Sequence, residues 1–131
     1  MSLLDTSVAV ALLVSDHSAH ERTIAQLPQG SLGLSGHAVF ETFSVITRLP
    51  NHRVSPAMAH TLISENFPRS IAYRATLEDL DEISRASLAG GQVYDALVAL
   101  AARSVDRTLL TRDERAMPTY LAMGVDVVLL S

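Results

Sequence analysis

The sequence contains no cysteine and no lysine, and only 18% of its residues are charged. Without cysteine, the chain has no disulfide, no thiolate nucleophile and no cysteine-ligated zinc. Without lysine, all ten basic residues are arginines, and the net charge of −4 gives no strong basic footprint for nucleic acid. If four acids were neutralised in a metal site, however, the remaining chain would be neutral. Net charge alone therefore decides little about partners.

Long hydrophobic runs are also missing. The apolar stretch from Val8 to Val14 has no basic segment before it, follows Asp5, and is far shorter than the ~20 residues of a membrane span. We therefore expect no membrane segment and a cytoplasmic protein. The length of 131 residues fits a single domain, 1–131, and 48% of the residues are apolar. Such a surplus of apolar residues predicts a homodimer or a tightly bound partner.

Short apolar runs alternate with helical patterns along the chain. Several helices have clear start signals: Thr6 or Ser7, Ser18 with Glu21 in a capping box, Ser55 before Pro56, and Thr76. The alternation predicts an α/β fold, a three-layer α/β/α sandwich around a short parallel sheet of about five strands. The expected strands are 3–4, 32–34, 71–73, 108–111 and 125–130; the expected helices are 8–14, 18–27, 37–49, 55–66, 76–88, 93–104 and 118–123.

Two acids occur among apolar neighbours. Asp5 ends the first strand, where helix capping is an equally simple explanation. Asp95 lies in the first turn of a helix, and the residues that follow it on its own face are Val98, Ala99 and Ala102. The helix dipole alone would favour an acid at this point, but it does not require burial among alanines. An unpaired buried carboxylate costs several kcal/mol, which makes both residues candidate site residues.

Two further acids are ambiguous when taken singly. Glu41 shares a helix stripe with His37, Ser44 and Arg48, so a surface pair with Arg48 is the simpler interpretation. Asp113 follows a strand in a polar loop. Sites in open α/β sheets form outside the carboxyl ends of the strands, and the topology can bring Asp5, Glu41, Asp95 and Asp113 to that one edge.

Four carboxylates in one pocket repel one another unless cations lie among them. Sites made only of carboxylates and water suit Mg²⁺ or Mn²⁺ better than zinc. Such ions can activate water and stabilise the leaving oxygen of a phosphodiester. Thr6 and Thr111 could orient ligands or water from behind the acids. The pattern therefore predicts a metal-dependent nuclease.

The ordered set of motifs resembles the PIN domain, and over essentially the whole chain it resembles the VapC toxins of bacterial toxin–antitoxin pairs. The segments that carry the resemblance are Leu3-Leu4-Asp5-Thr6-Ser7-Val8, Phe40-Glu41-Thr42, Asp95-Ala96-Leu97, Leu110-Thr111-Arg112-Asp113 and the stretch to Gly124-Val125.

This resemblance implies an Mg²⁺- or Mn²⁺-dependent endoribonuclease that cuts RNA, often tRNA or ribosomal RNA. It also implies a homodimer that a cognate VapB-type antitoxin inhibits by covering the acidic pocket. Asp5, Glu41, Asp95 and Asp113 match the acids of the family, and Asp5 and Asp95 are the first candidates for direct metal ligands. The RNA contacts stay unassigned; Arg48, Arg112 and Arg115 are the arginines nearest to the acids in sequence.

Two alternatives can be weighed on the sequence. A phosphoacceptor receiver domain needs adjacent acids after its first strand and a late lysine, and this chain has neither. A catalytically inactive PIN-like interaction domain remains open, although all four acids are present. His17 and His20 have a possible metal spacing, but no third ligand lies nearby in sequence. We expect them at a solvated helix start, and we assign no role to His37.

Overall fold

The fold is described from a computed structural model of the chain, for residues 1–51 and 53–131. Within these ranges the sheet has four parallel strands in the order β2-β1-β3-β4. They are β1 (Ser2–Leu4), β2 (Leu32–Leu34), β3 (Leu109–Thr111) and β4 (Val127–Leu129). The helices are α1 (Thr6–Leu13), α2 (His20–Gln26), α3 (Ala38–Thr47), α4 (Pro56–Asn66), α5 (Leu77–Arg85), α6 (Gln92–Ser104) and α7 (Met117–Ala122), with a 3₁₀ turn, η1, at Glu114–Ala116.

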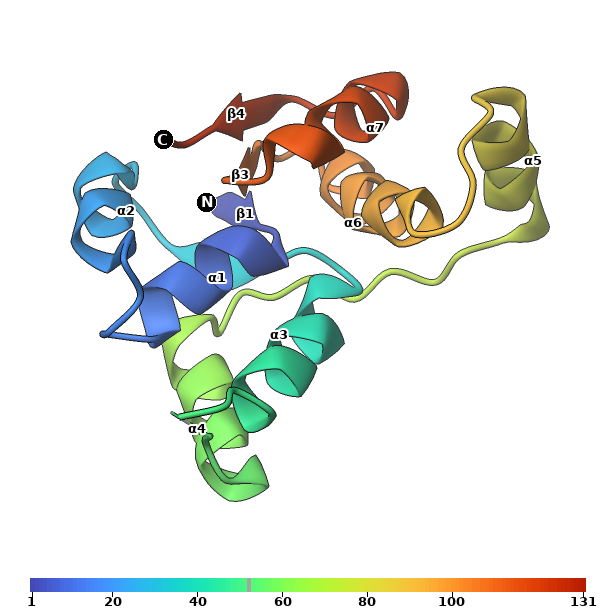
Figure 1. Ribbon diagram of the computed structural model, residues 1–131. Coiled ribbons are helices and arrows are strands. Elements are labelled where there is room, and N and C mark those ends of the chain that lie inside the picture. The colour runs from blue at the N-terminus through green and yellow to red at the C-terminus, as the bar shows by residue number, and fades with distance from the viewer. Residues whose placement is uncertain (52) are drawn as a thin grey trace.

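The sheet lies between two layers of helices (Figure 1). Successive residues of a strand point to opposite faces, so Leu3 joins the core under α6 and α7, whereas Leu4 joins the core under α1, α3 and α4. Leu109 and Leu110 divide in the same way. The three-layer α/β/α sandwich predicted from the sequence is thus confirmed.

The strand expected at 71–73 is not formed. Only Ile71 pairs, through one isolated bridge to Ser35, and the Gly36 N–H donates to the Ile71 carbonyl at 2.7 Å. Ser35 already lies past the end of β2, so residues 72 and 73 have no strand beside them. The chain then runs out to α5, which stands apart from the sheet in Figure 1. The described sheet therefore has four strands rather than about five.

Some helix boundaries also differ from expectation. Asp5, one of the caps that the sequence offered, caps α1 by accepting from the Val8 N–H, whereas Thr6 and Ser7 lie inside the helix. Ser18 does not cap α2, which begins at His20 without a side-chain cap. The helix predicted to reach residue 88 ends at Arg85, because Ser87 takes a left-handed conformation and the Leu88 N–H returns to the Ile83 carbonyl.

The end of β2 packs tightly against α6. Gly36 has a φ of +54°, and a Cβ there would approach the Cβ of Ala101 to 2.8 Å. The buried Ser35 hydroxyl donates to the Val98 carbonyl at 2.7 Å. This close approach holds the chain just before α3 against Val98 and Ala101 of α6. Glu41, on α3, and Asp95, on α6, line one cavity.

Candidate active site

One cavity at the carboxyl end of the sheet receives all four predicted acids. It has a volume of about 290 Å³ and is lined by Asp5, Thr6, Ser7, Val10, His17, Glu41, Val45, Asp95, Val98, Arg112, Asp113 and Tyr120. Asp5 follows β1, Asp113 follows β3, Glu41 lies on α3 and Asp95 lies on α6. The convergence expected from parallel topology is therefore present, although each acid comes from a different part of the chain.

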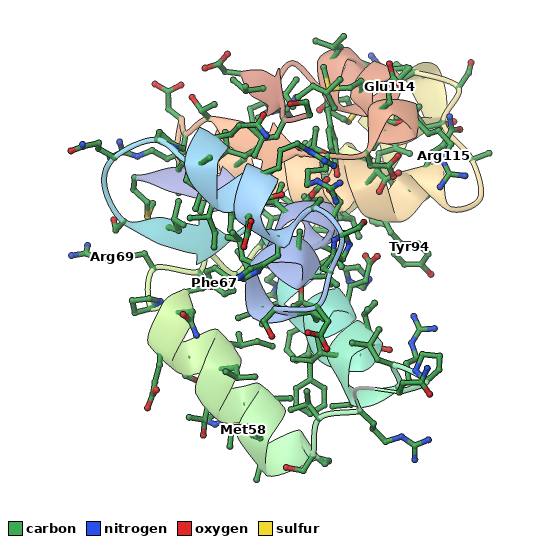
Figure 2. The ribbon with its side chains drawn as sticks, turned by 60° about the vertical axis from the view of Figure 1, so that its left-hand side comes forward. Met58, Phe67, Arg69, Tyr94, Glu114 and Arg115 are labelled. Atoms are coloured by element: carbon green, nitrogen blue, oxygen red, sulfur yellow. The ribbon has the colours of Figure 1, made fainter. Side chains whose placement is uncertain are left out.

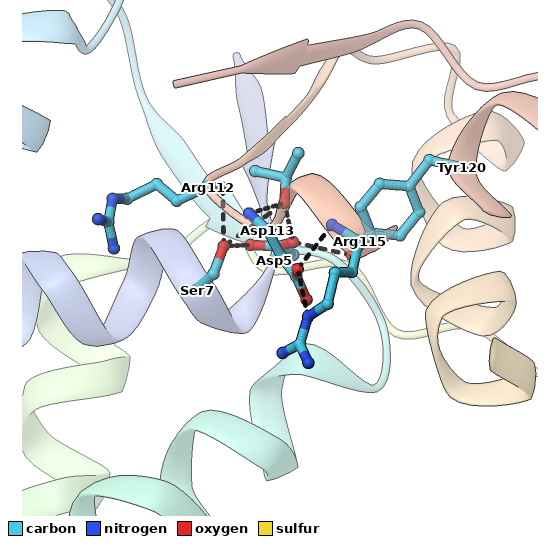
Figure 3. Close-up of polar contacts among 7 residues, drawn as sticks. Asp5, Ser7, Arg112, Asp113, Arg115 and Tyr120 are labelled. Carbon is cyan, nitrogen blue, oxygen red and sulfur yellow. Dashed lines mark hydrogen bonds and ion pairs between the residues drawn. The ribbon is translucent and has the colours of Figure 1, made fainter. Parts of the chain in front are cut away.

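Asp5 is the most constrained of the four, with only 4% of its surface exposed. Its Oδ1 accepts from the Ser7 hydroxyl at 2.6 Å and from the Val8 N–H at 3.3 Å. Its Oδ2 accepts from Thr111 Oγ1 at 2.5 Å and from the Tyr120 hydroxyl at 2.8 Å. Figure 3 shows the side-chain contacts of Ser7 and Tyr120 with this carboxylate. Burial raises the pKa of Asp5, while the four donors counteract that rise.

Thr111 connects two of the acids. Its hydroxyl oxygen donates to Asp5 and accepts from the Asp113 N–H at 3.0 Å, so one side chain orients both residues. The Asp113 carboxylate in turn accepts from the Arg115 N–H at 3.0 Å and lies 3.7 Å from Arg115 Nε. Thr6 lines the cavity, and its buried hydroxyl has no hydrogen-bond partner within the described part of the chain.

Asp95 is half-buried, and its pKa is raised to about 6. The main cause is burial, and the negative charges of Asp113, Glu41 and Asp5 add to it. Glu41 is exposed at the rim of the cavity. Among the described residues it makes no ion pair, so the surface pair with Arg48 is not formed; the two residues do line one neighbouring groove. The raised pKa of Asp95 is the effect expected when several negative charges are held close together.

Several residues in the site were not predicted from the sequence. Tyr120 and Ser7 hold Asp5, and Tyr120 is the largest side chain among those that are fully buried. His20 begins α2, as expected, and its ring bonds to the Ala11 carbonyl. His17 is not at a helix start: it lies in the loop before α2, is partly buried and lines the cavity. No local pattern identifies Tyr120, because it lies 115 residues from Asp5.

The oxygen atoms that line the cavity can be compared with the ligands that a divalent cation requires. Carboxylate oxygens are the ligands that Mg²⁺ and Mn²⁺ prefer, and the mutual repulsion at Asp95 is what a cation would relieve. Among the described residues, however, no group of three or more His, Asp or Glu side chains is arranged to hold a metal ion. The chemistry of the residues fits a cation, and the side chains would have to close around it.

Comparison with known proteins agrees with this fold. The PIN domain family matches residues 2–119. The chain is 44% identical to Ribonuclease VapC27 of Mycobacterium tuberculosis (strain ATCC 25618 / H37Rv), with 95% of this chain and 93% of that protein covered. It is 38% identical to Ribonuclease VapC40 of Mycobacterium tuberculosis (strain CDC 1551 / Oshkosh), with 97% of each covered.

Solved structures share the architecture at lower identity. FitAcB from Neisseria gonorrhoeae superposes with a TM-score of 0.67 at 22% identity, covering 97% of this chain and 96% of its own. PAE2754 from Pyrobaculum aerophilum gives a TM-score of 0.57 at 21% identity, covering 96% of this chain and 81% of its own. These structures support the fold.

Proposed function

The chain belongs to the PIN domain family, and we propose that it is a metal-dependent endoribonuclease that acts as the toxin of a toxin–antitoxin pair. The observation that carries the proposal is the cavity in which four carboxylates meet, with the pKa of Asp95 raised to about 6 by burial and by the other three acids. Its relatives of similar length are named as VapC ribonucleases.

We propose Asp5, Glu41, Asp95 and Asp113 as the residues that hold Mg²⁺ or Mn²⁺. When bound, the ion would lower the pKa of water and neutralise charge on the phosphodiester and its leaving oxygen. Asp95 and Glu41 have carboxylate oxygens free of protein hydrogen bonds within the described residues, whereas each oxygen of Asp5 already accepts two. Asp5 would therefore supply a fixed negative charge at a defined place.

The protein's own groups then have distinct tasks. Ser7, Thr111 and Tyr120 prevent Asp5 from rotating, and Thr111 ties its position to the backbone of Asp113. Val10, Val45 and Val98 form an apolar part of the cavity lining. Because these three hydroxyls of Ser7, Thr111 and Tyr120 all donate to Asp5, its carboxylate would keep one orientation when a cation binds beside it.

The proposed substrate is RNA, of the tRNA or ribosomal RNA class, and the proposed inhibitor is a cognate VapB-type antitoxin. Membership of the PIN domain family and the names of the relatives as VapC ribonucleases support this proposal. No helix of the described residues is long and apolar enough to cross a membrane. A cytoplasmic location stays a prediction from the sequence.

A homodimer is proposed from the apolar surface beside the site. Phe40, Leu77 and Tyr94 are 75%, 84% and 53% exposed. Phe40 lines three grooves: one shared with Tyr94 and Asp95, one shared with Ala75, directly before α5, and one shared with Ile63 of α4. Figure 2 shows Tyr94 projecting from the start of α6 into solvent. A second copy is the simplest cover for such a surface in a chain with 48% apolar residues.

The dimer can be tested by sedimentation of Phe40→Glu. Burying a charge without a partner in an apolar interface costs several kcal/mol, so this variant should sediment as a monomer. Met58→Glu is the matched control, because Met58 is 53% exposed on α4 and lines none of the three grooves. A dimer that persists in Phe40→Glu would place the interface elsewhere.

The nuclease proposal is tested with purified protein, total tRNA and ribosomal RNA, by mapping new 5′ ends in the presence of Mn²⁺. Asp95→Asn and Asp5→Asn should abolish the cuts, and Asp95→Asn should also lose Mn²⁺ binding in titration calorimetry. Glu65→Gln, an exposed acid on α4, is the charge-matched control and should cut as wild type does.

Two results would contradict parts of this proposal. Wild-type protein that binds Mn²⁺ but cuts none of these RNAs would favour the alternative, a catalytically inactive PIN-like interaction domain. An Asp95→Asn variant that binds Mn²⁺ as tightly as wild type would remove Asp95 from the set of ligands.

A further inference from the structure

The acidic cavity also has a side that carries hydrogen-bond donors. His17, from the loop between α1 and α2, and Arg112, from the residue after β3, line the same cavity as the four acids. Neither residue forms an ion pair with those acids in the described structure. A cation that lies beside four carboxylates without pairing to any of them keeps its donors available for another anion.

The backbone of Arg112 is held by a hydrogen bond, whereas its side chain has no ion-pair or hydrogen-bond partner among the described residues. Its backbone N–H donates to the Ser7 hydroxyl at 2.8 Å, which is the hydroxyl that also bonds Asp5. Its Nε is buried and has no hydrogen-bond partner among the described residues. In Figure 3 the side chain extends from this network toward the side of α1, whereas Arg115 leaves it in another direction. A buried N–H without an acceptor is costly, and a ligand oxygen would relieve that cost.

The hydrogen-bonding of His17 defines which of its ring nitrogens can donate. Its Nδ1 accepts from the Ala19 N–H at 3.0 Å, so in the neutral ring the proton resides on Nε2. Burial lowers the pKa of His17, and the charges of Arg112 and Arg22 and the neighbouring His20 lower it further, so the surroundings favour the neutral ring. The proximity of Arg112 also disfavours a metal cation at this imidazole.

We propose that Arg112 and His17 bind the phosphate backbone of the RNA next to the bond that the acidic site cuts. Arg112 would contribute a charged fork of N–H donors and His17 one neutral N–H donor. This inference rests on the proposed ribonuclease function and assigns its substrate contacts. Backbone contacts of this kind position the nucleic acid and carry no sequence information.

The test measures RNA binding rather than cleavage. A fluorescein-labelled 20-nucleotide single-stranded RNA of random sequence is titrated with protein in Ca²⁺ in place of Mg²⁺, and the affinity is followed by anisotropy at several salt concentrations. The variants are Arg112→Gln, Arg112→Lys and His17→Phe. Arg69→Gln is the matched control, since Arg69 is exposed and projects on the far side of the molecule from Arg115 in Figure 2. Urea unfolding of each variant verifies that it is folded.

The two residues should give different signatures. Arg112→Gln should bind about tenfold more weakly, the loss expected for one charge-assisted hydrogen bond, and the slope of log K against log salt should fall by about 0.7. Arg112→Lys keeps the charge and should keep the slope. His17→Phe should weaken binding while leaving the slope unchanged, because a neutral donor releases no counterion. Arg69→Gln should match wild type.

Failure of this inference is distinguishable from failure of the proposed function. If wild type cleaves RNA, but Arg112→Gln binds the probe with wild-type affinity and slope, the ribonuclease stands and the assigned contacts are wrong. If Arg112→Gln keeps its RNA affinity but loses a co-expressed antitoxin, Arg112 belongs to the protein interface and the inference fails. If wild type neither binds nor cleaves RNA, the proposed function and the inference fail together.

Discussion

Neutralising Asp95 should stabilise the metal-free protein. Asp95 is in the first turn of α6, where the helix dipole stabilises a negative charge by about 0.3–1 kcal/mol. The opposing effects are burial and the charges of Asp113, Glu41 and Asp5, which together raise the pKa of Asp95 from 3.8 to about 6. A rise of that size means that the net effect of the folded surroundings disfavours the carboxylate. We therefore expect Asp95→Asn to increase the free energy of unfolding in EDTA.

The magnitude follows from the pKa. The rise from 3.8 to about 6 corresponds to about 3 kcal/mol if it were expressed fully. Asp95 is only half-buried, so solvent screens part of this and we expect about 1–2 kcal/mol. The folded state holds its proton to a higher pH than the unfolded state does, so the penalty begins above pH 3.8 and is complete above about pH 6. The stabilisation should therefore be largest at pH 8 and smaller at pH 4.5.

Urea unfolding in EDTA at both pH values measures this difference. Glu65→Gln removes the same charge from an exposed position on α4 and should change stability by less than about 0.5 kcal/mol. Adding Mg²⁺ should reverse the order, because only the wild type would then gain stability from the bound ion. Loss of stability in Asp95→Asn at pH 8 without metal would show that the dipole outweighs the repulsion, and would refute this reasoning.

Three further changes test the supports of the site by urea unfolding or hydrogen exchange. Tyr120→Phe removes a 2.8 Å hydrogen bond to a buried carboxylate and should cost about 1.5 kcal/mol. Gly33→Ala should cost more than about 2 kcal/mol, because its Cβ would lie 2.3 Å from the Arg69 carbonyl oxygen, whereas Gly91→Ala meets no atom within 4 Å and should be tolerated. Thr76→Ala removes the capping box of α5 and should cost about 1 kcal/mol, with faster amide exchange confined to that helix.

Local signals in the sequence were sufficient where one residue decides the local structure. Ser55 before Pro56 predicted the start of α4, and Thr76 predicted the start of α5. At the start of α1 the sequence offers Asp5, Thr6 and Ser7 in succession, and local rules cannot rank them. The carboxylate caps the helix because Thr111 and Tyr120 also donate to it, and these donors come from distant parts of the chain.

The meeting of the four acids could be predicted from the sequence, because parallel topology places the ends of the strands at one edge of the sheet. The residues that hold these acids in place could not be predicted. Tyr120 reaches Asp5 only because α7 packs against α6, and an aromatic residue in a short helix gives no sign of this. His17 lies in a loop whose course depends on how α2 packs against α1. The positions of such residues are determined by tertiary packing, so they cannot be predicted from the pattern within one segment.

The geometry divides the site into two unlike halves. Asp5 is held by donors from α1, β3 and α7, so that side of the cavity is rigid. Glu41 and Asp95 form the other side, and they also line the groove shared with Phe40 and Tyr94. A second molecule that covered those exposed rings would reach Glu41 and Asp95 first and would leave Asp5 unmoved. Metal affinity should therefore depend on assembly through Glu41 and Asp95. Phe40→Ser adds no charge to the groove that Phe40 shares with these acids, so it should change the titration of Asp95 only by separating the two molecules.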